Sequence, residues 1–171
     1  MSTLKNNLLV RDKREAPIDI TFHYTNKDMV KDLIAITPLS GVILDAGSGK
    51  NKVWFNNIPD TCEKLECEIQ DGSDFLLWNK KVDWVIGNPP FDIMEQFIKK
   101  GSEVADKGFA WLLSIRGFNS LTPKRLADVY DKGFFLHRIH IVSDKRWYGR
   151  YYYLIFTKIP NELLSWNKKT Y

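Results

Sequence analysis

A strand that ends in two prolines constrains this chain more than any other stretch. Residues 82–86 read Val-Asp-Trp-Val-Ile, and this nearly apolar, β-branched and aromatic run is typical of a buried strand in a parallel sheet. Gly87 ends the run, and Pro89-Pro90 cannot continue a central strand because proline has no backbone N–H. The residues that follow are therefore expected on a stiff loop at the carboxyl end of the strand, where open α/β sheets bind ligands.

The loop itself is rich in hydrogen-bond acceptors. The two prolines remove two donors, which leaves the side-chain oxygen of Asn88 and the carbonyls of Asn88 and Pro89. Such a set suits a ligand that brings its own N–H groups, for example an exocyclic amine. Phe91 adds a flat apolar ring on which a planar ligand can stack. The pattern favours a socket for adenine, and a plain proline-rich turn after a core strand is the alternative.

A second pattern lies upstream, where a short strand at residues 41–44 runs into Asp45-Ala46-Gly47-Ser48-Gly49. Glycines at alternate positions permit a tight turn and a close approach of a ligand to the backbone. The carboxylate of Asp45 at the strand tip suits a cationic amine. The segment is not a dinucleotide-binding fingerprint, because the third glycine is missing. It is not a P-loop either, because no Ser or Thr follows the lysine.

Together the two motifs resemble those of S-adenosylmethionine-dependent amino-methyltransferases. Gly87-Asn88-Pro89-Pro90-Phe91 is similar to the signature of enzymes that methylate N6 of adenine in DNA. The same signature occurs in enzymes that act on protein glutamine or on adenine in ribosomal RNA. The resemblance covers residues 20 to 160 and implies S-adenosylmethionine as the cofactor. It also implies an α/β, Rossmann-like methyltransferase fold, with a mostly parallel sheet and a C-terminal antiparallel hairpin.

The resemblance also implies roles for individual residues. Thr25, at the start of a predicted helix, would contact the methionine end of the cofactor, although Asn26 stands where the family has proline. An acidic residue at the end of the next strand would bind the ribose diol. Glu68 is the first choice, Glu66 the second, and a solvent-facing Glu the plain alternative. Asp74-Phe75 would accept a hydrogen bond from the adenine amine and pack on its ring. The predicted catalytic residues are Asn88, Pro89, Pro90 and Phe91, and the predicted cofactor-binding residues are Thr25, Asp45, Gly47, Gly49, Glu68, Asp74 and Phe75.

The chain departs from the family after the second strand. Only five residues separate Glu68 from Asp74, too few for the helix and strand that the family has here. The sheet is therefore expected to be shortened at this edge, or its third strand to be vestigial. Farther along, the spacing predicts helices from residue 92 to 105, which Gly101 could interrupt, and from residue 122 to 132. Strands are predicted at residues 109–113, 134–142 and 151–156.

Basic and aromatic residues gather in the link between the last two strands, where Lys145, Arg146, Trp147, Tyr148 and Arg150 suit contact with nucleic acid. A tyrosine-rich hairpin stacked on the core is the alternative. Residues 1–20 are expected to form a basic N-terminal arm, and residues 21–171 a single catalytic domain without a separate target-recognition domain. Target specificity would then be lax, come from the loops at residues 117–124 and 143–150, or come from a partner.

Composition narrows the class of protein. A chain of 171 residues with 44% hydrophobic residues allows one domain with a real core and excludes a disordered chain. No apolar run is long enough to cross a bilayer, and the first twenty residues are too charged for a signal peptide. The two cysteines, Cys62 and Cys67, have no metal-ligand spacing, so no metal site is expected. Both cysteines are expected to be reduced thiols, which predicts that the protein is located in the cytoplasm of a cell or of an infected host.

The sequence thus predicts methyl transfer to the exocyclic N6 amine of adenine in DNA, with the base flipped out of the duplex or presented in a single strand. The net charge of +4 permits a nucleic-acid partner without requiring one. RNA adenine and protein glutamine stay open as acceptors, and so does a catalytically silent nucleic-acid-binding subunit of the same fold. A homodimer or a separate recognition partner is also left open, and no membrane partner is expected.

Overall fold

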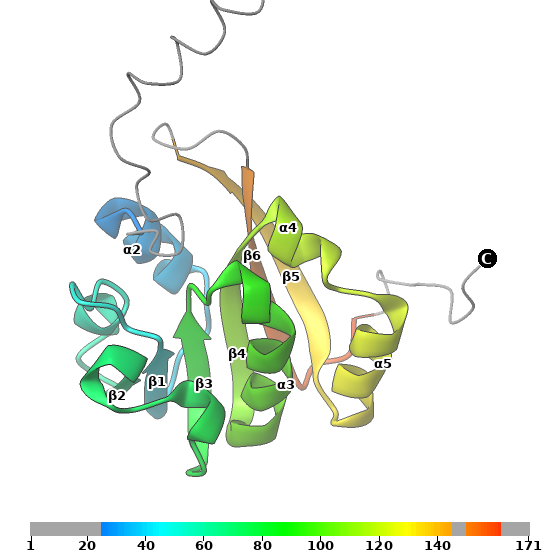
Figure 1. Cartoon of the computed structure of the whole chain (residues 1–171), viewed down its shortest axis with the longest axis horizontal. Helices are drawn as coiled ribbons and strands as arrows, with labels where there is room; N and C mark the ends of the chain where they lie inside the picture. The colour runs from blue at the N-terminus through cyan, green and yellow to red at the C-terminus, as the bar shows by residue number, and fades with distance from the viewer. Residues whose placement is uncertain (1–24, 145–149, 162–171) are drawn as a thin grey trace, which may run out of the picture.

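One mixed sheet organises the molecule. The computed structural model describes residues 25–144 and 150–161, so the predicted N-terminal arm and Lys145 to Tyr148 lie outside the described residues. Within them, six strands have the order β2-β1-β3-β4-β6-β5 (Figure 1). All are parallel except β6, which is antiparallel to both neighbours. The strands are β1 (Val42–Ala46), β2 (Glu63–Cys67), β3 (Val82–Gly87), β4 (Ala105–Ser114), β5 (Phe135–Ser143) and β6 (Arg150–Thr157). The predicted fold class is confirmed.

Helices cover both faces of the sheet, which explains why its central strands are apolar on both sides. Helices α3 (Met94–Val104) and α5 (Pro123–Asp131) lie on one face, and α2 (Lys27–Ala35) lies on the other. Side chains alternate along β3: Val85 belongs to the core under α3, while Trp84 and Ile86 belong to the core under α2. Among the described residues, no helix is both long enough and apolar enough to span a membrane.

The sheet is shortened at the edge where the sequence predicts it. Strand β2 is the outermost strand, and two 3-10 turns, Ile69–Asp71 and Phe75–Leu77, follow it in place of a helix and a further strand. Glu68 caps the first turn by accepting from Gln70 N at 3.2 Å, and Asp74 caps the second by accepting from Leu76 N at 2.8 Å. The two acidic residues therefore begin the two turns that replace this part of the sheet.

Helix α3 runs through Gly101 without the interruption that the sequence left open. A Cβ added at Gly101 would lie 3.1 Å from the ring of Trp111 and 3.2 Å from that of Phe109. The glycine therefore lets the helix approach β4 closely, and this packing outweighs the low helix propensity of glycine.

The segment at residues 117–124, expected as a loop, begins inside a short helix, α4 (Ile115–Asn119). Ser114 caps this helix by accepting from Gly117 N at 3.4 Å. Phe118 then stacks on Tyr152 of β6 with ring centroids 4.6 Å apart. This contact between residues distant in sequence fixes the segment against the sheet.

Candidate active site

The glycine loop after β1 has space beside it that the described residues do not fill. Gly47 and Gly49 have φ values of +75° and +65°, in the left-handed region that favours glycine. Among the described residues, a Cβ added at Gly47 would meet its nearest atom, Cε1 of Phe97, at 4.0 Å, and one added at Gly49 would meet nothing within 4 Å. The loop therefore leaves room for a ligand to lie against the backbone.

Glu68 joins this loop to the end of β2. Gly49 N donates to Oε2 of Glu68 at 2.8 Å, and Gln70 N donates to Oε1 at 3.2 Å. The residue is 9% exposed, so the carboxylate lies at the loop rather than in bulk solvent. A carboxylate oxygen can accept more than one hydrogen bond, which leaves Glu68 able to accept from a ligand as well.

Glu66, the second choice for the ribose contact, links β2 to the glycine loop through two hydrogen bonds in this structure. Ser48 Oγ donates to its Oε2 at 2.8 Å, and Lys52 Nζ donates to its other oxygen. Partial burial opposes ionisation, but the hydrogen bonds from Lys52 and Ser48 together lower the pKa of Glu66 below its usual value. Glu66 therefore holds the loop in shape, while Glu68 stands closer to the loop backbone.

Asp45 is completely buried and only partly hydrogen-bonded. Its Oδ2 accepts from Phe55 N at 2.9 Å, and its Oδ1 has no hydrogen-bond partner among the described atoms. Burial raises the pKa of Asp45 to about 7, with the Phe55 N–H opposing the shift and the carboxylates of Glu66 and Glu68 adding to it. A buried carboxylate with an unsatisfied oxygen is costly, so a cation brought to this point would be stabilising.

The loop after β3 lies next to the glycine loop because Gly87 has no side chain. A Cβ at Gly87 would lie 2.6 Å from the carbonyl oxygen of Ala46, at the end of β1. Asn88 follows, and its Nδ2 donates to Thr25 Oγ1 at 3.2 Å. Thr25 directly precedes Asn26, the residue that caps α2. Three segments that are distant in sequence thus meet at the carboxyl edge of the sheet.

The rest of the predicted acceptor motif lies on the same edge. Pro89 is buried, Pro90 is exposed, and the Pro90 carbonyl accepts from Ile93 N at 3.3 Å. Phe91 is half-buried, begins the 3-10 turn Phe91–Ile93, and packs against both apolar cores. Its ring therefore lies just beyond the end of β3 and contacts the apolar cores on both faces of the sheet.

Phe75 lies in the core of this structure, and its contact with an adenine ring stays a prediction. It is 2% exposed, and its ring centroid lies 4.9 Å from that of Phe97 and 5.8 Å from that of Trp111. Because the usual third strand is missing, the turn that carries Phe75 packs directly onto the sheet and α3. Asp74, by contrast, is half-buried at the start of this turn.

Two apolar side chains missed by the sequence reasoning lie beside these turns. Ile69 directly follows Glu68 and is 66% exposed, and Leu77 is 79% exposed. Exposed apolar side chains next to two carboxylates are candidates for packing against a planar ring. The sequence did contain a signal for Ile69, because an apolar residue directly after the acidic end of a strand lies where a bound ring could pack.

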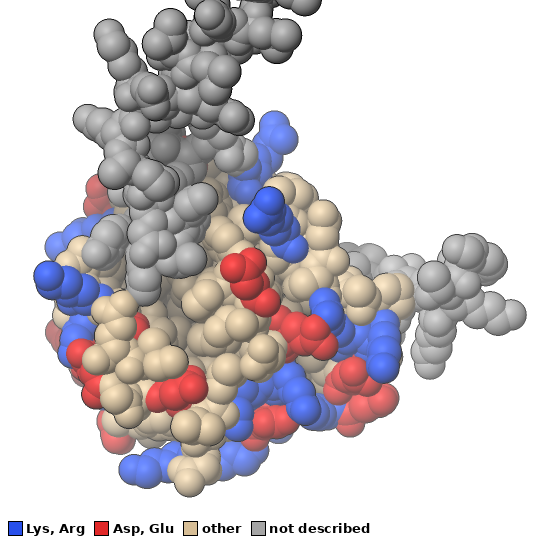
Figure 2. All heavy atoms as spheres, in the orientation of Figure 1, with Lys and Arg blue, Asp and Glu red and all other residues tan. Residues whose placement is uncertain are grey.

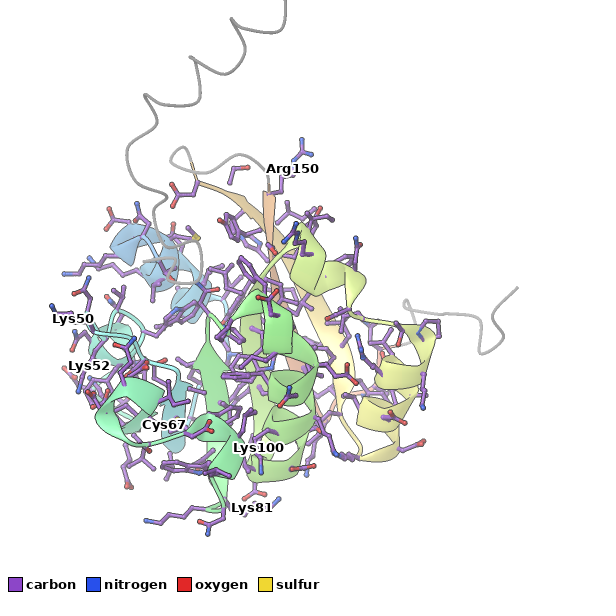
Figure 3. The ribbon with its side chains drawn as sticks, in the orientation of Figure 1. Lys50, Lys52, Cys67, Lys81, Lys100 and Arg150 are labelled. Carbon is purple, nitrogen blue, oxygen red and sulfur yellow. The ribbon has the colours of Figure 1, made fainter. Side chains whose placement is uncertain are left out.

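Of the residues predicted to contact nucleic acid, the structure describes Arg150. This exposed residue opens β6 opposite Ser143 and, because β6 is antiparallel, lies at the same edge as the carboxyl ends of the other strands (Figure 3). Lys81 and Lys100 lie at the opposite end, where Lys81 pairs with Asp106 at 3.6 Å. Among the described residues on the face in Figure 2, basic and acidic side chains are interspersed.

Comparisons with known proteins identify the fold. No protein-family model and no curated sequence matches this chain. Solved methyltransferase structures do match it. Magnesium protoporphyrin IX methyltransferase from Synechocystis, solved with bound S-adenosylmethionine, matches with a TM-score of 0.58 at 14% identity, over 93% of this chain and 100% of its own. Precorrin-6y C5,15-methyltransferase from Geobacter metallireducens matches with a TM-score of 0.59 at 13% identity, over 86% and 95%.

A third match is 1,6-didemethyltoxoflavin-N1-methyltransferase from Burkholderia thailandensis, solved with S-adenosylhomocysteine. Its TM-score is 0.58 at 12% identity, over 92% of this chain and 88% of its own. The chain therefore has the Rossmann-like fold of S-adenosylmethionine-dependent methyltransferases. The methyl acceptors named for these three proteins differ, so the acceptor must be argued from the site.

Proposed function

We propose that this protein is an S-adenosylmethionine-dependent methyltransferase that acts on the exocyclic N6 amine of adenine in DNA. The observation that carries the proposal is the position of Asn88. Its side-chain amide is held at the carboxyl edge of the sheet, next to a glycine loop whose neighbouring space the described residues leave open. An amine acceptor and a cofactor cradle are thus adjacent.

The residues around the glycine loop fit the parts of this cofactor. The buried Oδ1 of Asp45 suits the cationic amino group, and Glu68 suits the ribose diol. Asp74 suits the adenine amine, with Ile69 and Leu77 exposed nearby to pack on the ring. When bound, the cofactor supplies an electrophilic methyl group on a sulfonium.

The residues of the second loop would orient the attacking amine. Asn88 Oδ1 and the Pro89 carbonyl accept hydrogen bonds from the N6 amine, which draws its lone pair out of conjugation with the ring. Phe91 stacks on the base and fixes its plane. With the cofactor bound, the nitrogen would attack its methyl group in line, the methyl–sulfur bond would break with S-adenosylhomocysteine as the leaving group, and the extra proton would leave to water. Rate acceleration comes from alignment of the two groups rather than from a general base.

Adenine inside a duplex must leave the stack to reach this edge, as it does in other enzymes that modify bases. Arg150 lies at the same edge, and a phosphate contact there would be consistent with the modest positive charge of +4. These features are compatible with a nucleic acid as the acceptor, and the assay below compares DNA with RNA and protein.

Methyl transfer from labelled S-adenosylmethionine to duplex DNA, single-stranded DNA, RNA and protein tests the proposal. We expect Asn88→Ala to lower methyl transfer by about a hundredfold or more, because one preorganised polar contact is worth that much. Its Kd for the cofactor should stay near that of the wild type. Asp92→Asn, a change at an exposed residue of the following 3-10 turn Phe91–Ile93, is the matched control and should keep full activity.

Detection of N6-methyladenine in DNA from cells that express the protein supports DNA as the acceptor. Methylation of RNA or protein without DNA would overturn that part of the proposal. Full activity of Asn88→Ala would overturn the assignment of the site, and failure of the wild type to bind the cofactor would overturn the enzyme itself.

A further inference from the structure

Thr25 contacts the acceptor motif in this structure. Its Oγ1 lies 3.2 Å from Nδ2 of Asn88, a residue 63 positions away in sequence. The resemblance to amino-methyltransferases assigned this threonine to the methionine end of the cofactor. The observed contact points to a task at the acceptor motif, because the hydroxyl accepts from the amide that would receive the substrate amine.

Both residues are held by rigid elements. Asn26 caps α2 by accepting from Asp28 N at 2.8 Å and from Met29 N at 3.3 Å, which fixes the backbone next to Thr25. Helix α2 then buries its apolar side against Trp84 and Ile86 of β3, the strand that leads into Asn88. The contact between Thr25 and Asn88 is therefore a direct result of the packing of α2 on β3.

The amide of Asn88 has two chemically different ends. When its Nδ2 donates to Thr25, its Oδ1 points away from Thr25. An amide turned the other way would present N–H donors to the substrate amine, which also carries donors, and the two would not bind. We propose that Thr25 is a positioning residue that holds the amide plane of Asn88 so that its oxygen receives the amine. This inference rests on the proposed methyl transfer.

Two substitutions separate this role from cofactor binding. Thr25→Val keeps the shape of the side chain and removes the hydroxyl, so kcat should fall by roughly fivefold to tenfold, the value of one hydrogen bond. Its Kd for S-adenosylmethionine should stay within about twofold of the wild type. Thr25→Ser restores the hydroxyl and should restore most of kcat. A raised Kd with an unchanged kcat at saturating cofactor would overturn the proposal and place Thr25 on the cofactor.

A readout that does not need activity tests the contact itself. The side-chain NH2 signals of Asn88 in a nitrogen-proton correlation spectrum are assigned by their loss in Asn88→Asp. In Thr25→Val these signals should shift and exchange faster with solvent, and in Thr25→Ser they should stay near their wild-type positions. Unchanged signals in Thr25→Val would overturn the contact.

The two hypotheses fail in different ways. If the wild type methylates an acceptor and Thr25→Val has wild-type kcat, the positioning role is wrong and the proposed function stands. If the wild type methylates none of the acceptors while the NH2 signals respond to Thr25→Val, the proposed function is wrong and the positioning role falls with it.

Discussion

Both ends of strand β1 have a glycine with positive φ and a nearby aspartate, but the two ends differ in how tightly these residues are packed. Gly41 precedes the strand with φ +80°, and Gly47 follows it with φ +75°. A Cβ at Gly41 would lie 1.9 Å from Oδ2 of Asp83, whereas the nearest atom to a Cβ at Gly47 is 4.0 Å away. The two glycines therefore share a backbone conformation, but among the described residues a side chain fills the space beside Gly41 and none fills the space beside Gly47.

The aspartates at the two ends differ in the same sense. Asp83 accepts from Val42 N at 2.8 Å and pairs with Lys107 at 2.9 Å, and these two contacts lower its pKa below the usual value. Asp45 accepts from Phe55 N, and burial raises its pKa to about 7. The amino end satisfies its own polar groups, while the carboxyl end leaves one unsatisfied within the described chain. Polar groups left incomplete in this way are expected where a ligand completes them.

The largest expected effect is at Gly41. Gly41→Ala places a methyl group on Asp83 and strains a left-handed residue, so the free energy of unfolding should fall by roughly 3 kcal/mol. Gly49→Ala has a similar φ but open space, so it should cost only about 1 kcal/mol. Urea denaturation measures both. Equal losses for the two variants would contradict the difference between the ends.

Asp45→Asn should stabilise the free protein and weaken cofactor binding. The folded pKa of Asp45 is raised to about 7 from 3.8, so its favourable contribution is present below the unfolded pKa and is lost as pH rises through the folded pKa. Asn does not titrate and can still accept from Phe55 N. At about pH 8 the variant should be more stable than the wild type by on the order of 2 kcal/mol, and the gap should close toward about pH 4.

Urea denaturation across this pH range measures the stability difference, and calorimetry at about pH 8 measures the Kd for S-adenosylmethionine, which should rise about tenfold or more. A variant that is less stable at high pH and binds the cofactor normally would show that Asp45 is structural, like Asp83.

The smallest expected effect is at Asp83. Its folded pKa is lowered, so its contribution is present above the unfolded value and is lost as pH falls through the folded pKa. Asp83→Asn weakens the contact with Lys107 and should cost about 1 kcal/mol near neutral pH, with the loss shrinking in acid. Cofactor affinity should not change. A clear loss of affinity would mean that the two ends are coupled.

The features that could be predicted from the sequence are those carried by contiguous residues. The strand before Gly87, the turn at Gly47 and Gly49, and the shortened edge after Glu68 each follow from local pattern and spacing. The site roles assigned to these residues stay predictions. Contacts between distant segments could not be predicted, because the pattern of a single sequence does not show which distant residues lie next to each other.

Phe75 and Gly101 illustrate what the patterns could not supply. The enclosure of Phe75 depends on how the turn after β2 packs when a strand is missing, and the helix through Gly101 depends on the rings of β4 that it approaches. The contact of Thr25 with Asn88 likewise requires the docking of α2 on β3. In each case a tertiary contact decides the role of the residue.

The most direct measurement is a crystal structure of the wild-type protein with S-adenosylhomocysteine. We predict that the amino group of the ligand lies by Asp45 and its ribose by Glu68, with its sulfur facing the amide of Asn88. Ligand density at the Gly41 end of β1, or an amide of Asn88 turned away from the sulfur, would contradict the account.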